Sequence, residues 1–209
     1  MAEMRFVCLT ALLCASALFA QKAEVRDGNV FLVAPSGAKT QLTFENRDLF
    51  PTVSPDGRSV AFVRIADPEN DFGVEGDQIC VVPIAGGREQ CSTARYQEGE
   101  QPLGGFVKPA WTADNRSVYF LADFSTNSEG LCRFDTATGK TAFISPASEF
   151  AIVKAGRWRG NIAASVETRE SNGIRYPFFV LSSAGEKLAR VGEPNEKLDA
   201  VVARIERTP

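Results

Sequence analysis

Residues 50–63 read Phe-Pro-Thr-Val-Ser-Pro-Asp-Gly-Arg-Ser-Val-Ala-Phe-Val, with apolar residues on both sides of Ser-Pro-Asp-Gly. Pro55 presets φ for the second position of a turn, Asp56 is tolerated at the third, and Gly57 can adopt the positive φ that returns the chain. The run 60–63 that follows is too apolar to lie on an open surface. This stretch therefore predicts a tight hairpin with a buried second strand.

Two kinds of hairpin alternate along the rest of the chain. The first kind recurs at 109–121 and more weakly at 151–165, so that Val60, Val118 and Ile162 occupy corresponding positions. The second kind has an apolar run, a small or polar turn and a more polar run, and it occurs at 29–43, 78–93, 130–141 and 177–188. Together the two hairpins form a four-stranded unit of roughly 40–50 residues, the length of a β-propeller blade.

These residues resemble a known repeat, the TolB-like, WD40-like PD40 repeat. The motif comprises Pro51, the Ser54–Gly57 turn, Ala61-Phe62 and the Gly86-Gly87 hairpin. A second copy keeps Pro109 and Trp111 and has Asp114-Asn115 in its turn, where Asn can also adopt positive φ. The resemblance implies an all-β, propeller-like fold of about four blades, each with four antiparallel strands, over residues 21–209. It also implies protein-binding or scaffold duties in the cell envelope.

The two ends of the repeat region bear on ring closure. The first element, which turns at Asp27-Gly28, supplies three strands of a blade, and we expect Asp199–Glu206 to be a single further strand. Joining these two ends would complete a fourth blade and remove exposed sheet edges. The alternative is a partial propeller that stays open or is completed by oligomerisation.

Residues 1–20 differ from the rest of the chain. Arg5 precedes the apolar run Phe6–Ala20, which is too short for a comfortable membrane span and ends in small residues. This pattern predicts a signal peptide over 1–20, cleaved after Ala20 or Ala17, with a retained membrane anchor as the alternative. We expect the mature domain, 21–209, to be periplasmic or extracellular, without membrane insertion, and to meet an oxidising environment.

Cys80 and Cys91 lie in the two arms of one predicted hairpin. If its loop is Ala85-Gly86, the two cysteines face each other and a disulfide is sterically allowed. If the turn includes Gly87, the register shifts and Cys91 points to the other face of the sheet.

Composition narrows the function classes. The net charge of −3 argues against a nucleic-acid partner, and the absence of histidine removes the commonest general base and the usual Ser-His nucleophile pair. The sequence contains neither a Gly-x-Ser-x-Gly nucleophile elbow nor a Walker-type phosphate loop. We therefore expect a non-catalytic binding module, with a carbohydrate-active or other enzyme built on a propeller face as the alternative.

The predicted connections differ in length on the two faces of the propeller. Turns such as Pro55-Asp56-Gly57 are minimal, whereas the connections 65–77 and 94–108 on the other face are long. Because binding residues concentrate on long loops, this face is the predicted binding face for a protein or, alternatively, a carbohydrate. Its candidate residues are Asp67, Glu69, Asp71, Glu75, Asp77, Arg95 and Tyr96. No cofactor is expected, because the acidic loop lacks the Gly and the Glu that an EF-hand calcium loop requires. Calcium held in another geometry is the alternative.

Overall fold

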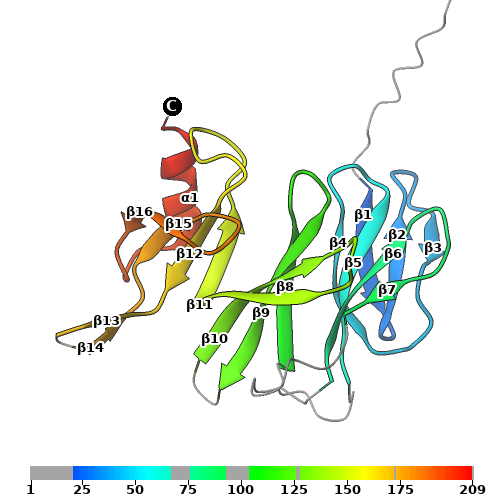
Figure 1. The fold of residues 1–209 in the computed structure, drawn as a ribbon. Helices are drawn as coiled ribbons and strands as arrows, with labels where there is room; N and C mark the ends of the chain where they lie inside the picture. Colours follow the sequence, from blue (N-terminus) through cyan, green and yellow to red (C-terminus); the bar gives the residue numbers. More distant parts are fainter. Residues whose placement is uncertain (1–20, 67–75, 93–103, 126–127, 172, 209) are drawn as a thin grey trace, which may run out of the picture.

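The computed structural model places the predicted strands in sheets that stand side by side as blades (Figure 1). It describes residues 21–66, 76–92, 104–125, 128–171 and 173–208. Blade 1 is a three-stranded sheet and blade 2 a four-stranded one. Their strands are β1 (Lys22–Arg26), β2 (Asn29–Val33) and β3 (Lys39–Gln41), then β4 (Asp48–Val53), β5 (Ser59–Arg64), β6 (Gln78–Pro83) and β7 (Gln90–Cys91).

Blades 3 and 4 form one seven-stranded sheet, in the order β16-β15-β12-β11-β10-β9-β8. They share β11 (Thr141–Ile152), whose first part pairs with β10 and whose second part pairs with β12. The other strands are β8 (Gly104–Trp111), β9 (Ser117–Ser125), β10 (Ser128–Asp135), β12 (Ile162–Val166), β15 (Phe178–Leu181) and β16 (Lys187–Gly192). A separate hairpin, β13 (Thr168–Glu170) with β14 (Gly173–Arg175), extends away from blade 4 (Figure 1). The all-β propeller prediction is confirmed, in an open form.

The turn at the start of β5 has the predicted conformation, with φ of 69° at Gly57. The Ser54 hydroxyl donates to Asp56 Oδ1 (2.6 Å) and accepts from the Ser59 backbone N–H (3.0 Å). The second copy has the same contacts, because the Thr112 hydroxyl donates to Asp114 Oδ1 (2.6 Å). Asn115 has φ of 60° in the place of the glycine. The motif therefore survives substitution because a hydroxyl, a carboxylate and a residue that tolerates positive φ are retained.

The second strand of each repeat is buried on both faces, which explains its uninterrupted apolar sequence. In β5, Val60 and Phe62 pack toward blade 1, whereas Ala61 and Val63 pack toward blade 3. The residues from Val60 to Val63 are fully buried. Each interface between neighbouring blades therefore has a hydrophobic cluster of its own, and side chains on alternate positions of one strand belong to two clusters.

The C-terminal strand predicted over Asp199–Glu206 is wrong, since Leu198–Glu206 is a helix, α1. Leu198, Val201, Val202 and Ile205 repeat at the helical spacing of three or four residues. Leu198, Val202 and Ile205 pack on the face of blade 4 that lies away from blade 3, and Val201 is also buried. A segment of nine residues can match both the two-residue period of a strand and the 3.6-residue period of a helix, and the prediction relied on the two-residue period. Ring closure by a C-terminal strand is wrong for the same reason.

One further boundary differs from the prediction. The loop expected up to residue 108 ends earlier, because β8 begins at Gly104. Between β12 and β15 the chain forms the β13–β14 hairpin. No helix in the described ranges is long and apolar enough to cross a membrane.

Candidate functional site

Most of the predicted binding-face residues lie outside the described residues: Asp67, Glu69, Asp71, Glu75, Arg95 and Tyr96. Their role stays a prediction. Asp77 is described and is 6% exposed. Its carboxylate accepts hydrogen bonds from the backbone N–H groups of Ala66 and Gly105, both at 2.9 Å. Asp77 therefore connects the chain after β5 to the start of β8, and little of its side chain is accessible to a ligand.

Carboxylates gather where β8, β9 and β10 meet. Asp123 lies against Gly105, where a Cβ atom would stand 2.2 Å from the Asp123 carboxylate, and Glu129 is its partner across the strands. Burial raises the pKa of Asp123, and the charge of Asp77 raises it further. Burial also raises the pKa of Glu129, against the opposing effect of Lys108. Within the described ranges, no group of three or more Asp, Glu, His or Cys side chains is placed to hold a metal ion.

The inner strands of blades 2 and 3 share an unusual backbone feature. Phe50 in β4 and Lys108 in β8 have positive φ, 51° and 54°, and each precedes a proline. The pairing registers shift at both places. Proline has no N–H to donate to the ladder, so each strand bulges there. Positive φ is costly at Phe and Lys, by about 1–3 kcal/mol, and such strain is concentrated at functional sites.

A groove of about 450 Å³ runs along the inner strands of blades 2, 3 and 4. Its walls are largely apolar, and two lysines line it. None of its described lining residues is acidic. They are Thr52, Val53, Pro55, Lys108, Pro109, Ala110, Trp111, Phe150, Ala151, Ile152 and Lys154.

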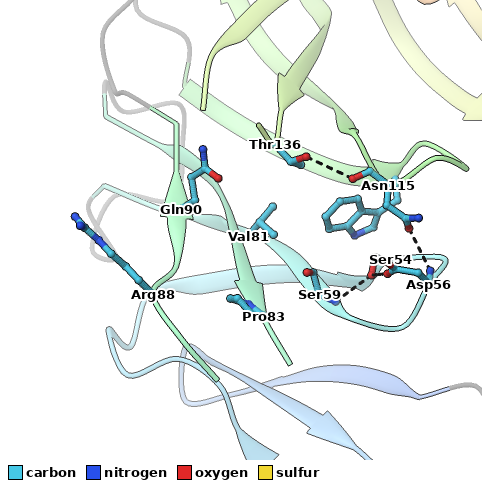
Figure 2. A pocket seen from close by; sticks show the side chains of 10 residues that line it. Ser54, Asp56, Ser59, Val81, Pro83, Arg88, Gln90, Asn115 and Thr136 are labelled. Atoms are coloured by element: carbon cyan, nitrogen blue, oxygen red, sulfur yellow. Dashed lines mark hydrogen bonds between the residues drawn. The ribbon is translucent and has the colours of Figure 1, made fainter. Parts of the chain in front are cut away.

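A second pocket, of about 290 Å³, lies between blades 2 and 3 at the face of the short turns (Figure 2). Its lining surface is about half polar and half apolar, and the lining residues are Ser54, Asp56, Ser59, Val81, Pro83, Arg88, Gln90, Trp111, Asn115 and Thr136. Trp111 lines both cavities; it is 8% exposed, and its indole N–H donates to the Thr52 carbonyl at 3.0 Å. Trp111 therefore acts mainly as a core residue that joins blade 3 to blade 2.

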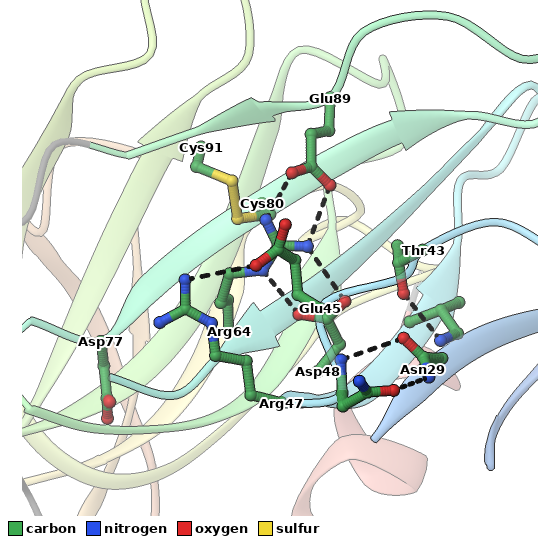
Figure 3. A network of polar contacts seen from close by, with 12 residues as sticks. Asn29, Thr43, Glu45, Arg47, Asp48, Arg64, Asp77, Cys80, Glu89 and Cys91 are labelled. Atoms are coloured by element: carbon green, nitrogen blue, oxygen red, sulfur yellow. Dashed lines mark hydrogen bonds and ion pairs between the residues drawn. A yellow bond between two sulfur atoms is a disulfide. The ribbon is translucent and has the colours of Figure 1, made fainter. Parts of the chain in front are cut away.

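Asp48, Arg64 and Glu89 form an ion cluster in blade 2, at the end of β5 that lies away from the Ser54–Gly57 turn (Figure 3). The Arg64 guanidinium donates to both oxygens of Asp48, at 2.7 and 3.0 Å, and to both oxygens of Glu89. Burial by itself lowers the pKa of Arg64, but hydrogen bonds to the two carboxylates outweigh this, and the net shift is upward. Beside the cluster, Cys80 pairs with Cys91 in the register expected for an Ala85-Gly86 loop, and a disulfide joins them.

Sequence reasoning missed both cavities. It assigned the Ser54–Gly57 turn a structural task only, whereas Ser54 and Asp56 also line the second pocket. It placed Lys108 at the end of a loop, whereas Lys108 projects from an inner strand. The signal that could have located this bulge was Pro109, because proline inside a predicted strand indicates an irregular ladder.

No protein-family profile and no curated protein matches the chain. Solved structures do match. TolB from Acinetobacter baumannii has 16% sequence identity and a TM-score of 0.50, over 79% of this chain and 38% of TolB. The β-propeller domain of the Trilobed protease from Pyrococcus furiosus has 14% identity and a TM-score of 0.53, over 78% of this chain and 49% of that one.

Dipeptidyl peptidase 4 of Porphyromonas gingivalis has 12% identity and a TM-score of 0.58, over 84% of this chain and 31% of the peptidase. The chain thus spans less than half the length of each of these three proteins. At such low identity the likeness shows the β-propeller fold, which agrees with the predicted TolB-like architecture. It does not transfer an activity, since TolB proteins and peptidases share the fold.

Proposed function

We propose that this chain is a non-catalytic protein-binding module, and that it takes an extended, acidic segment of a partner protein in the inner groove. The single observation that carries this proposal is the groove itself, in which two strained inner strands and the β11–β12 region surround apolar walls with two lysines. The likeness to TolB proteins supports a binding role at the level of fold.

The chemistry of the groove selects the kind of segment. Lys108 and Lys154 supply positive charge, and Phe150 and Ile152 supply apolar surface. A partner segment that alternates carboxylates with apolar side chains would match both features. Main-chain groups on the inner edges of the blades can add hydrogen bonds to an extended backbone, as in β-strand addition.

A catalytic alternative receives less support. A carbohydrate-active enzyme of the usual kind needs two carboxylates on either side of the bond that is cleaved. Asp123 and Glu129 are neighbours with raised pKa values, but neither lines the groove or the second pocket. Burial is the main cause of both raised pKa values; the charge of Asp77 adds to the shift at Asp123, and the charge of Asp123 adds to the shift at Glu129.

The test is site-specific photo-crosslinking in an extract of the source cells, with the photoreactive residue at Ala151 in the groove. We expect one partner to be captured there, and none of it by the same residue at Leu188, which is exposed on the outer strand β16. The crosslinked peptide of the partner should be acidic and extended. Capture at both positions alike would contradict a groove-specific site.

Charge variants then test the lysines on the purified pair. Lys154→Glu should weaken binding at least tenfold, and more so at low salt, because an attractive charge becomes repulsive. Lys140→Glu is the matched control, since Lys140 is exposed on a turn and does not line the groove. If the two variants bind equally well, the electrostatic part of the proposal is wrong.

The proposal includes export of the chain through a cleaved signal peptide. The apolar run of residues 1–20 and the Cys80–Cys91 disulfide both suit a chain that matures outside the reducing cytoplasm. N-terminal sequencing of the mature protein tests this, with cleavage expected after Ala20 or Ala17. An uncleaved N-terminus would contradict it.

A further inference from the structure

The second pocket is a gap between two bridges that join blade 2 to blade 3. On its inner side, the Asp56 backbone N–H donates to the Asn115 side-chain oxygen at 3.1 Å (Figure 2). On its outer side, the Gln90 amide donates to the Thr136 carbonyl at 2.8 Å and accepts from the Gly139 N–H at 3.1 Å, in the orientation that satisfies both ends of the amide. The bridges hold the two blades together and bound the gap on two sides.

These bridges limit what can enter. An extended peptide would have to pass through one of them, whereas a compact molecule can enter between them. The volume of about 290 Å³ is at the lower end of the range for small-molecule sites, which is about 300–1,000 Å³. The pocket therefore suits one small ring system and not a chain segment, which distinguishes it from the inner groove.

The polar lining offers both donors and acceptors that the described part of the chain does not use. The Ser59 hydroxyl donates no hydrogen bond to any described residue, and the exposed Arg88 guanidinium forms no ion pair with one. At the other side, the Ser54 hydroxyl holds the pKa of Asp56 below its usual range, so this carboxylate is ionised at neutral pH. Only Oδ1 of Asp56 accepts hydrogen bonds from described groups.

The apolar part of the lining is about as large as the polar part. Val81, Pro83 and Trp111 supply it, beside the polar groups. Alternating hydroxyl donors and acceptors around a ring with apolar C–H faces is the chemistry of a sugar. Phosphate matches less well, since it would face the Asp56 carboxylate. A free amino acid can pair its carboxylate with Arg88 and its ammonium with Asp56, but it offers no ring hydroxyls to Ser59, and glycine offers no apolar face to Val81 and Pro83.

From this geometry we infer that the pocket between the Asp56–Asn115 and Gln90–Thr136 bridges is a binding site for a single sugar unit, held by Ser59, Arg88 and Asp56. It is separate from the protein-binding groove and does not depend on it. A ligand of this size is expected to bind with a dissociation constant of about 1 mM, because small ligands gain little free energy in total.

The test uses the full mature chain in a Trp158→Phe background, which leaves Trp111 as the one tryptophan. Neutral hexoses, N-acetylhexosamines and hexuronates are titrated to about 10 mM, followed by Trp111 emission and by ligand-observed saturation-transfer NMR. Glycine and inorganic phosphate are the comparison ligands. We expect saturable binding of at least one sugar and none of glycine or phosphate.

Variants then locate the binding. Ser59→Ala and Arg88→Ala should each weaken sugar binding about fivefold or more, the usual effect of one lost hydrogen bond. Arg58→Ala is the matched control, because Arg58 lies on the same turn, is exposed and does not line the pocket. Melting curves establish that each variant is folded.

Three outcomes would overturn the inference. The first is the absence of sugar binding by both readouts. The second is sugar binding that Ser59→Ala and Arg88→Ala leave unchanged. The third is saturable binding of glycine or phosphate in place of sugars. Failure of crosslinking in the groove would contradict the proposed function and would leave this inference untouched, so the two proposals fail separately.

Discussion

Replacing Arg64 should destabilise the fold far more than replacing an arginine in an equally close surface pair. The side chains of Arg64 and Asp48 are 6% and 0% exposed, and Glu89 is 33% exposed. Arg64→Met removes the positive charge and leaves the Asp48 carboxylate without its counter-charge in a site that water does not reach. Breaking a buried ion pair in this way costs about 3–5 kcal/mol.

The control is Arg190→Met. Arg190 is bound to Glu193 at 2.6 Å, but the two side chains are 45% and 60% exposed. An exposed pair of this kind contributes about 0–1 kcal/mol, since water and salt screen the charges. The two variants therefore compare the same side-chain change at similar contact distance, and they differ in burial.

The assay is reversible urea unfolding of the oxidised protein. With a slope of about 2 kcal/mol per M, a loss of about 4 kcal/mol lowers the midpoint by about 2 M, whereas the control should shift it by less than about 0.5 M. The double variant Arg64→Met with Asp48→Leu should regain most of the loss, because it removes the uncompensated charge. Equal midpoint shifts for Arg64→Met and Arg190→Met, or no recovery in the double variant, would refute the reasoning.

Three other perturbations test the disulfide, the helix and the carboxylate pair. Removing the Cys80–Cys91 bond, which spans 11 positions, by Cys→Ala at both sites should lower the unfolding free energy by about 2–3 kcal/mol, and added reductant should affect the natural chain but not the variant. Ile205→Ala should cost about 2–5 kcal/mol in urea unfolding, because this buried side chain fastens α1 to blade 4. Asp123→Asn should raise the melting temperature near pH 7 and have less effect near pH 4. The raised folded-state pKa of Asp123 means that its ionised form destabilises the fold, and this cost disappears as the pH falls through that pKa.

The strands and turns of this chain could be predicted because local chemistry determines them. Gly57 and Asn115 supply positive φ at the expected positions, and the runs that follow are buried on both faces, as their apolar sequences indicate. Pairing of Cys80 with Cys91 was one of two registers that the glycines allowed, and the choice depended on which residues form the loop.

The cavities could not be predicted in the same way, because they arise where separate blades meet. The second pocket combines residues of a turn in blade 2, the segment before β7, and two turns of blade 3. Each segment has an ordinary local pattern. What joins them is the Asp56–Asn115 contact, which links positions 59 residues apart and depends on the angle between two sheets. Repeat patterns identify blades, and the packing between blades determines the cavities.

Residues 198–206 form a helix on blade 4, and this helix covers an apolar face that a strand added to blade 1 would leave exposed. Ala163 and Val180 lie on the face of blade 4 away from blade 3, and both are fully buried because Ile205, Leu198 and Val202 of α1 pack on that face. A single strand at the inner edge of blade 1 would have left this apolar face exposed. A helix about 10 Å wide can cover several neighbouring strands, which are each about 4.8 Å apart. The same nine residues cannot both cover blade 4 and complete blade 1, so closing the ring with this segment would first require α1 to leave blade 4, at the cost of the apolar contacts that bury Ile205.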